Sequence, residues 1–226
     1  MKHTVSAGLL LWTLAFLPQA WAAGGAHFVD DSETETPGTC HLETWVATFF
    51  QADGILNAAP ACTTRRIPWL EIGAAYEHYW GSVNAPVFGP AMKVNFRSET
   101  TGLGIGLGLN SGVDLGTGEL AFAMPVLLAT LPINDKVRFN ANAGWNYLAA
   151  AETPNALFYG AQFEIDVGGN VQLMVESFGR APGFPGIQMG LRFTPNNGPI
   201  DFDLLVANYF DPGTTRFVTF GVTVRY

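Results

Sequence analysis

Apolar and polar side chains alternate with a period of two along most of this chain. In the run 136–147 every odd position from Val137 to Tyr147 is apolar or aromatic, whereas the even positions carry Lys, Arg, Asn or Gly. Successive side chains of a β-strand point to opposite faces, so this pattern predicts a strand with one apolar and one polar face. The runs 157–167, 87–97 and 187–194 alternate in the same way, and clusters of Gly, Pro, Asn, Asp and Thr separate the runs.

Twelve runs of this kind are predicted as strands: 40–50, 56–64, 69–80, 87–97, 102–110, 119–131, 136–147, 157–167, 171–178, 187–194, 200–207 and 216–226. The run 56–64 is the weakest, because it contains Pro60 and alternates little. With it the count is even, as it must be when both termini of a barrel lie in the periplasm, and ten strands is the alternative. We expect an all-β fold, a closed antiparallel up-and-down transmembrane β-barrel with periplasmic N- and C-termini.

A soluble β-sandwich would also alternate, so a second feature must separate the two folds. Large aromatic residues near the strand ends indicate girdles at the two membrane interfaces; they are Trp69, Trp80, Trp145, Tyr147, Tyr159, Tyr209 and Tyr226. The links between the predicted strands also alternate in length, from short ones such as 98–101 and 168–170 to longer ones such as 111–118 and 148–156. Short turns on the periplasmic side and longer loops outside are typical of outer-membrane barrels.

The composition supports a membrane protein and excludes some partners. Hydrophobic residues make up 48% of the chain, charged residues only 13%, and there are 26 glycines. The formal net charge of -8 argues against binding nucleic acid through a basic surface. No pattern indicates a cofactor or a metal ion, and we expect none.

The N-terminal residues predict export. A basic start and an apolar run end at small residues, which is the pattern of a signal peptide over residues 1–22, cleaved after Ala22 or Ala23. The apolar run is shorter than the roughly 20 residues of a spanning helix. Residues 23–38 are acidic, contain Gly and Pro and have no periodicity, so we expect a flexible lead-in before the barrel at 39–226, in the outer membrane of a Gram-negative bacterium.

The last residues form a predicted strand that ends with the chain. Thr219, Gly221, Val224 and Tyr226 resemble the C-terminal signal that outer-membrane barrels present to the barrel-assembly machinery. The expected partners are therefore that machinery, the lipids and lipopolysaccharide of the outer membrane, and an unidentified small solute.

The two cysteines, Cys40 and Cys62, fall near the same end of adjacent predicted strands. An even number of cysteines in an exported protein favours a disulfide, and two separate buried thiols are the alternative.

Charged residues on the polar strand faces are candidates for lining the interior. Both signs are present, so they could form a constriction that selects solutes by charge, or salt bridges that knit a filled interior. For any one of them we favour the structural role. The candidates are Glu71, Glu77, Lys93, Arg97, Arg138, Glu164, Asp166, Glu176, Arg192, Asp201, Asp203 and Arg225.

Catalysis has little support in this sequence. A serine hydrolase needs Ser, His and an acid within hydrogen-bond reach. Only His27, His41 and His78 follow the signal peptide, and His78 with Glu77 and Ser82 is the one plausible set. His78 shares its parity with apolar positions, which places it on the lipid-facing side, so we expect no enzyme.

Several strand motifs together resemble a known family. They are Asp30-Asp31 through Pro37-Gly38, then Leu42, Glu43 and Trp45, then 69–76, 104–109, 140–145 and 175–179. They resemble the outer-membrane transporter family associated with the MetA pathway of phenol degradation, and that resemblance implies passage of small aromatic compounds. Residues 51–68 and the cysteine pair depart from it.

The sequence thus indicates a passive channel or transporter for small solutes, and the family resemblance implies that these are apolar or aromatic. Two alternatives stay open. One is a lipid-modifying enzyme of the deacylase or phospholipase type, and the other is a structural or surface-interaction barrel with a blocked lumen.

Overall fold

The computed structural model describes residues 26–50, 53–211 and 215–226, so the predicted signal peptide and its cleavage site lie outside the described residues. The described residues form strands and two short 3-10 helices, η1 (Glu99–Thr101) and η2 (Pro195–Asn197). The strands are β1 (Cys40–Phe49), β2 (Gly54–Thr63), β3 (Leu70–Trp80), β4 (Ala85–Arg97), β5 (Gly104–Asp114), β6 (Leu120–Asn134), β7 (Val137–Leu148), β8 (Asn155–Gly168), β9 (Val171–Ala181), β10 (Pro185–Phe193), β11 (Ile200–Tyr209) and β12 (Arg216–Arg225). Among these residues no helix has the length and apolarity needed to cross a membrane.

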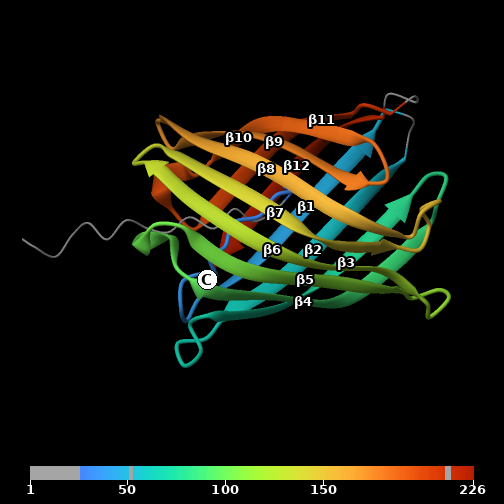
Figure 1. Cartoon of the computed structure of the whole chain (residues 1–226), viewed down its shortest axis with the longest axis horizontal. Coiled ribbons are helices and arrows are strands. Elements are labelled where there is room, and N and C mark those ends of the chain that lie inside the picture. The colour runs from blue at the N-terminus through green and yellow to red at the C-terminus, as the bar shows by residue number, and fades with distance from the viewer. Residues whose placement is uncertain (1–25, 51–52, 212–214) are drawn as a thin grey trace, which may run out of the picture.

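Each strand pairs antiparallel with its neighbours in the chain, and β1 pairs with β12 from His41 opposite Arg225 to Phe49 opposite Phe217 (Figure 1). The sheet is therefore closed, which removes its edges. The predicted twelve-stranded antiparallel barrel is confirmed. Its weakest predicted strand is present as β2, whose pairing with β3 is interrupted at Ala59 and Pro60, where proline has no amide hydrogen to donate.

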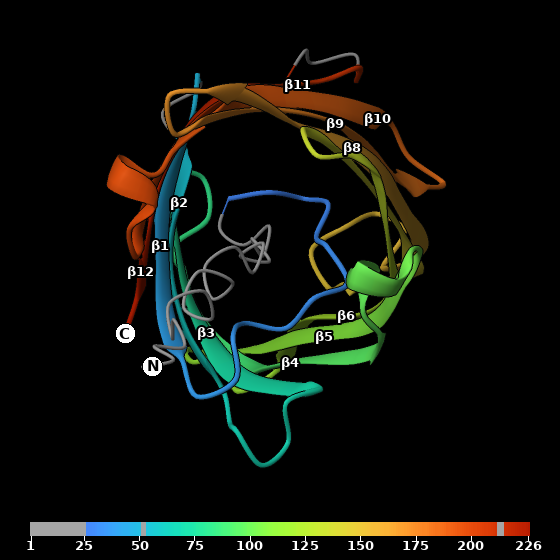
Figure 2. The same cartoon turned by 90° about the vertical axis from the view of Figure 1, so that its left-hand side faces the viewer.

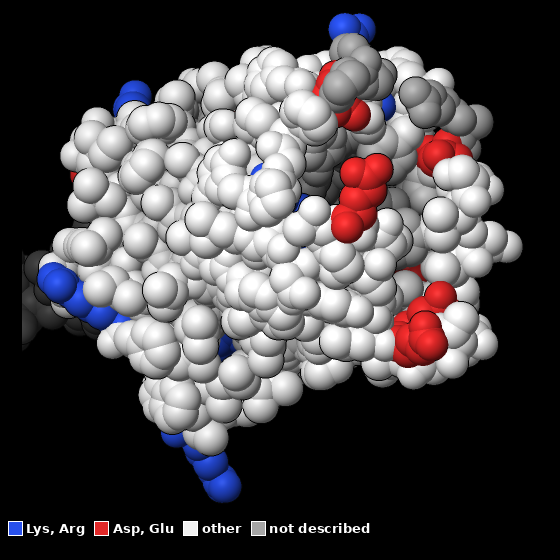
Figure 3. Space-filling view, turned by 45° about the vertical axis from the view of Figure 1, so that its right-hand side comes forward, with Lys and Arg blue, Asp and Glu red and all other residues white. Residues whose placement is uncertain are grey.

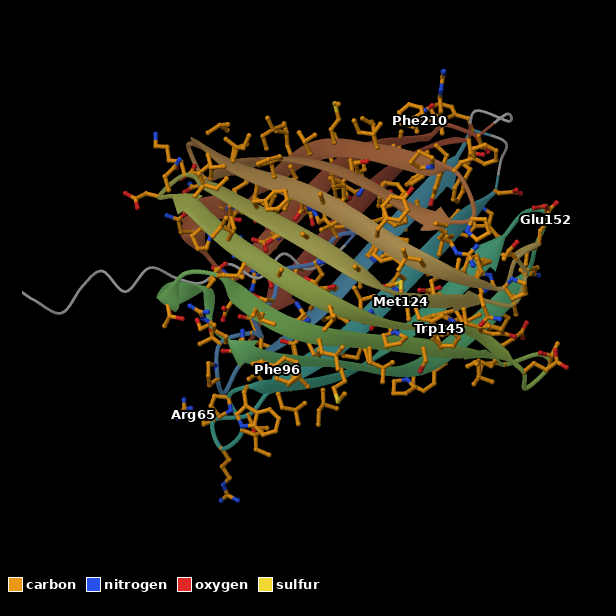
Figure 4. All side chains as sticks on the ribbon, viewed as in Figure 1. Arg65, Phe96, Met124, Trp145, Glu152 and Phe210 are labelled. Atoms are coloured by element: carbon orange, nitrogen blue, oxygen red, sulfur yellow. A yellow bond between two sulfur atoms is a disulfide. The ribbon has the colours of Figure 1, made fainter. Side chains whose placement is uncertain are left out.

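The two faces of the barrel reverse the arrangement of a soluble protein. Outward side chains are apolar and exposed, such as Leu127 at 60% and Phe220 at 52%. Inward side chains are polar and buried, such as Gln162 and Asn140, both 0% exposed. Exposing apolar side chains to water costs free energy, so an apolar belt around a polar interior indicates that lipid is the solvent outside. Figure 4 shows the side chains projecting from the outer surface along the barrel.

The links at the two ends of the barrel have similar lengths. We call the end that holds Cys40 and Tyr226 the terminus end and the opposite one the loop end. At the terminus end the links 98–103 and 194–199 contain η1 and η2 and are as long as 149–154 at the loop end. The predicted contrast between short and long links is therefore wrong, because 3-10 turns lengthen links that the sequence pattern treats as tight.

The predicted disulfide is confirmed. Cys40 and Cys62 lie directly opposite each other on β1 and β2, with their Cα atoms 4.0 Å apart, and their sulfur atoms are bonded. No free cysteine is present among the described residues. The pair ties together the first two strands next to the seam where β1 meets β12.

A charge on the apolar belt is expected to destabilise the protein. Leu127 is on the outer face near the middle of β6, so Leu127→Arg should cost about 2–4 kcal/mol of unfolding free energy in lipid vesicles. Reversible urea unfolding, followed by tryptophan fluorescence, measures this. The control is Leu115→Arg in the link after β5, where water is available and a change within about 0.5 kcal/mol is expected. Equal effects at both positions would contradict a lipid-facing belt.

Candidate functional site: the barrel interior and its internal segment

Residues 26–38, which we call the internal segment, pass through the interior of the barrel before β1 begins (Figure 2). Val29, Asp31 and Ser32 are 0% exposed, and Glu35 is 4% exposed. This differs from the expectation of a flexible acidic lead-in. Acidic, aperiodic sequence indicates a hydrated segment, and here the polar interior of the barrel takes the place of bulk water.

Inward glycines make room for the internal segment. A Cβ atom on Gly104 would lie 2.3 Å from Ser32 Oγ, and one on Gly106 would lie 3.0 Å from the Ser32 carbonyl oxygen. On the other side a Cβ atom on Gly160 would lie 2.5 Å from Val29 Cγ2. Any larger side chain at these positions would displace the segment. The inward glycines of β5 and β8 therefore act as a seat for it.

The backbone of the internal segment bonds to side chains of the barrel. A chain outside a sheet must find other acceptors for its amides when it is buried. The amide of Val29 donates to Glu176 Oε2 at 2.9 Å, that of Ser32 to Thr130 Oγ1 at 2.8 Å, and that of Glu35 to Glu71 Oε2 at 2.7 Å. These acceptors come from β9, β6 and β3, so the segment is held from several sides of the lumen.

Aromatic packing anchors the segment toward the loop end. The ring of Phe28 stacks on that of Phe178, with centroids 3.8 Å apart, and meets Tyr209 and Phe217 edge-on. Val29 packs in the cluster formed by Phe158 and Phe178. Burying one such side chain contributes about 1.5–3 kcal/mol. The internal segment is therefore held by apolar as well as polar contacts.

Ion pairs anchor the segment toward the terminus end. Lys93 Nζ lies 2.8 Å from Asp30 Oδ2 and 3.6 Å from Asp31 Oδ1. Arg138 contacts Asp31 at 3.1 Å, and it also binds Glu99 at 3.1 Å and Glu164 at 2.8 Å. Removing one partner of a buried ion pair is strongly destabilising, because the other charge stays buried and unpaired.

Arg225 makes the corresponding link at the start of β1. Its guanidinium contacts Glu35 at 2.8 Å and Asp201 at 2.8 Å, and Arg192 binds Asp203 at 2.7 Å beside it. The interior is thus knitted by ion pairs, some within the wall and some between wall and segment.

The predicted lumen candidates divide into three groups. Glu71, Lys93, Arg138, Glu164, Glu176 and Arg225 face inward, and each contacts the segment or a group that binds it. Arg192, Asp201, Asp203 and Glu77 face inward and bond to other wall residues. Arg97 and Asp166 are exposed at strand ends and bond to the turn residues Thr101 and Gly168. A register shift after Asn95 explains why Arg97 leaves the inward row.

The remaining predicted positions are placed by the strand register. In the C-terminal motif Thr219 and Gly221 are buried inside the barrel, whereas Val224 and Tyr226 belong to the outward row, and β12 closes the barrel against β1.

The residues considered for hydrolysis are not hydrogen-bonded to one another in the described part of the chain. Ser82 donates from its amide and its hydroxyl to Asp53, at 2.7 and 2.8 Å, and these bonds lower the pKa of that carboxyl. His78 sits opposite Leu56 in the outward row of β3, and its Nδ1 has no hydrogen-bond partner. Glu77 instead accepts a hydrogen bond from the Tyr79 hydroxyl. Among the described residues there is also no group of three or more His, Cys, Asp or Glu suited to a metal ion.

Residues of the wall that the sequence did not single out complete the seat. Asn142 accepts from the Asp30 amide at 2.8 Å and donates to the Asp30 carbonyl oxygen at 2.8 Å. Gln162 and Gln188 bond to Glu176. The sequence offered one signal for the segment, namely the uncharged polar residues of the inward rows and the glycines opposite them. This signal indicates that something other than water fills this part of the lumen.

The comparisons with known proteins place the fold. The family model described as "Uncharacterised conserved protein UCP029691" matches residues 11–226, so the chain belongs to that family. The barrel is similar to the KdgM porin in complex with disordered oligogalacturonate, with a TM-score of 0.64, 8% identity and coverage of 81% of this chain and 98% of that one. It is also similar to the NanC porin (TM-score 0.60, 7% identity, 81% and 98% covered) and to Omp33 of Acinetobacter baumannii (0.51, 7%, 83% and 98%). No curated protein is significantly similar to the chain in sequence.

The contacts of the internal segment predict strong protection of Ser32. In otherwise unchanged protein a Ser32→Cys thiol should react slowly with a membrane-impermeant maleimide, and Arg138→Gln should speed the reaction at least about tenfold because it removes the ion pair to Asp31. Arg216→Gln at the loop end is the matched control and should leave the rate unchanged. If the Ser32→Cys thiol reacts as fast as a Thr100→Cys thiol in the exposed η1 turn, the segment is not inside the barrel.

Proposed function

We propose that the protein is a passive channel in the outer membrane of a Gram-negative bacterium, with both termini in the periplasm. The observation that carries this proposal is the closed barrel with an apolar exterior and a polar interior. Such a barrel exposes no unpaired backbone group to lipid. The likeness to porins supports a channel, and the C-terminal strand would present the assembly signal at the periplasmic end.

The proposed solute class is small and apolar or aromatic. The resemblance of the strand motifs to the phenol-associated transporter family supports it, and so do the aromatic rings of Phe49 and Tyr79, which line a cavity at the loop end. Aromatic rings bind other aromatic rings by stacking and edge contacts. An export signal, removed at residue 22 or 23, would deliver the chain to the membrane.

A second candidate function is a structural barrel without an open lumen. The internal segment favours it, because this segment fills part of the interior and is fixed by both aromatic and ionic contacts. A voltage across a lipid bilayer should drive an ionic current through a channel but not through a barrel with a blocked lumen.

Single-channel recording in planar bilayers separates these candidates. The native protein should give small, well-defined conductance steps. Phe28→Ser, Val29→Ser and Asp31→Asn combined keep the segment length but remove its anchors, and this variant should conduct severalfold more because the segment no longer occupies the lumen. Thr34→Ser, Thr36→Ser and Pro37→Ser, in the same segment but outside these anchors, form the matched control. If the native protein gives no conductance steps and the first variant gives large ones, the result supports the blocked barrel instead.

A lipid-modifying enzyme is the remaining alternative, and it is tested separately. Because Ser82 bonds to Asp53 and makes no hydrogen bond to His78, Ser82→Ala and His78→Ala should have no effect on lipopolysaccharide or phospholipid composition in cells that express the protein. Mass spectrometry of extracted lipids measures this. A change in acyl-chain content that appears with the native protein and disappears in either variant would overturn the channel proposal.

A further inference from the structure

Solvent reaches the barrel interior unevenly. On β8 to β12 the inward residues are largely buried, including Met174, Phe178 and Gln188, all at 1%. On β2 to β4 five inward residues are small and partly exposed, whereas Asn57, Thr63, Glu71 and Val87 in the same rows are buried; the five are Ala59, Ala61, Gly73, Ala75 and Ala91. The internal segment fills the space next to the glycines of β5 and β8, and it also contacts Glu71 of β3 and Lys93 of β4. Space for water and solute therefore lies along β1–β4, which we call the β1–β4 passage.

A cavity of about 340 Å³ opens at the loop end of this same side of the barrel. Its lining includes Phe49 and Tyr79, which belong to the inward rows of β1 and β3, together with Asp53 and Arg216. The Arg216 guanidinium donates to Asn208. The cavity thus forms the loop-end entrance above the β1–β4 passage.

Carboxylates dominate the charged groups along the passage. Glu43 and Glu77 project inward from β1 and β3, and Asp30 of the internal segment has a side chain that is 38% exposed. The one ammonium group of this side, on Lys93, is already paired with Asp30. The Glu43 carboxylate lies 3.6 Å from His41 Nε2, and the Glu77 carboxylate accepts a hydrogen bond from the Tyr79 hydroxyl. The passage is therefore electronegative.

Asn57 adds an acceptor at the same level. It is 5% exposed, it belongs to the inward row of β2, and it lies between Trp45 on β1 and Glu77 on β3 in the strand register. Its Oδ1 atom has no hydrogen-bond partner among the described residues. A buried acceptor without a donor costs about 1–3 kcal/mol, so it favours a donor or a cation from the solution.

The loop end carries the same sign. Exposed acidic residues Glu119 and Glu152 lie in its links, whereas Arg65 and Arg66 project at the terminus end. Figure 3 shows acidic side chains gathered around a hollow at the loop end, and Figure 4 shows Glu152 and Arg65 at opposite ends of the barrel. Charges of one sign around a channel mouth raise the local concentration of ions of the opposite sign.

We infer that the β1–β4 passage conducts cations in preference to anions, and that Glu77 and Asn57 contact the permeating cation at its narrowest part. This inference rests on the proposed channel function and specifies which side of the lumen conducts and which sign of charge it favours. A solute that follows this route is neutral or cationic, since an anionic one would meet Glu43 and Glu77, for which the described residues supply no Lys or Arg partner.

The reversal potential in a KCl gradient across a planar bilayer tests the inference. The native protein should favour K⁺ over Cl⁻. Glu77→Gln should lower the permeability ratio by up to about fivefold, the factor that a unit charge about 4 Å away produces in water. Asn57→Leu should lower it without changing the net charge. The matched control is Asp135→Asn, which makes the same change of charge in the turn between β6 and β7 and should leave the ratio unchanged.

A pair of tryptophan variants tests the route. Ala75→Trp, on the inward row of β3, should reduce the conductance strongly, whereas Ala74→Trp, one residue earlier and on the lipid-facing row, should leave it intact. Urea unfolding and the electrophoretic shift on heating verify that each variant is folded.

The outcomes separate this inference from the channel proposal. Preference for Cl⁻, equal effects of Glu77→Gln and Asp135→Asn, or equal effects of the two tryptophans would overturn the β1–β4 passage and leave the channel standing. Absence of current in the native protein and in the variant with a released segment would overturn both.

Discussion

The pairing of every backbone amide and carbonyl within the sheet is the constraint on which this structure depends. In hydrocarbon an unpaired backbone group costs several kcal/mol, so a sheet is stable there only when its last strand meets its first. Here β12 meets β1 over the whole strand, and the Cys40–Cys62 disulfide ties β1 to β2 beside that seam. The closed wall then defines an interior whose chemistry is independent of the lipid outside.

That interior determines where the acidic N-terminal residues lie. Carboxylates such as Asp31 could not be buried against apolar side chains, but the barrel presents Arg138 and Lys93 to them, and the side chains of Glu176 and Thr130 to the backbone amides. Glycines on β5 and β8 supply the space. The segment therefore fills one side of the lumen, whereas small, partly exposed alanines line the other, and the proposed β1–β4 passage rests on this asymmetry.

The period of two was sufficient to predict the strands and their faces, because lipid outside and polar groups inside impose opposite demands on alternate residues. The disulfide followed from two cysteines that lie near the same end of adjacent predicted strands in an exported chain. The internal segment could not be predicted in the same way. Its contacts join residues far apart in the sequence, such as Val29 with Glu176, and an acidic stretch without periodicity reads as hydrated chain in any environment. Arg97 also departed from its predicted face, because a register shift in β4 has no signature in the alternation.

The central claim is that the segment lies in the lumen of the protein in a membrane, seated against β5. The most direct measurement is oxidative cross-linking of Ser32→Cys with Gly104→Cys in lipid vesicles, read by mass spectrometry of the linked peptides, since a Cβ atom at position 104 points directly at the Ser32 side chain. The structure predicts nearly complete cross-linking of this pair and none between Ser32→Cys and a Gly118→Cys at the loop end. Equal, low yields for both pairs would show that the segment lies elsewhere.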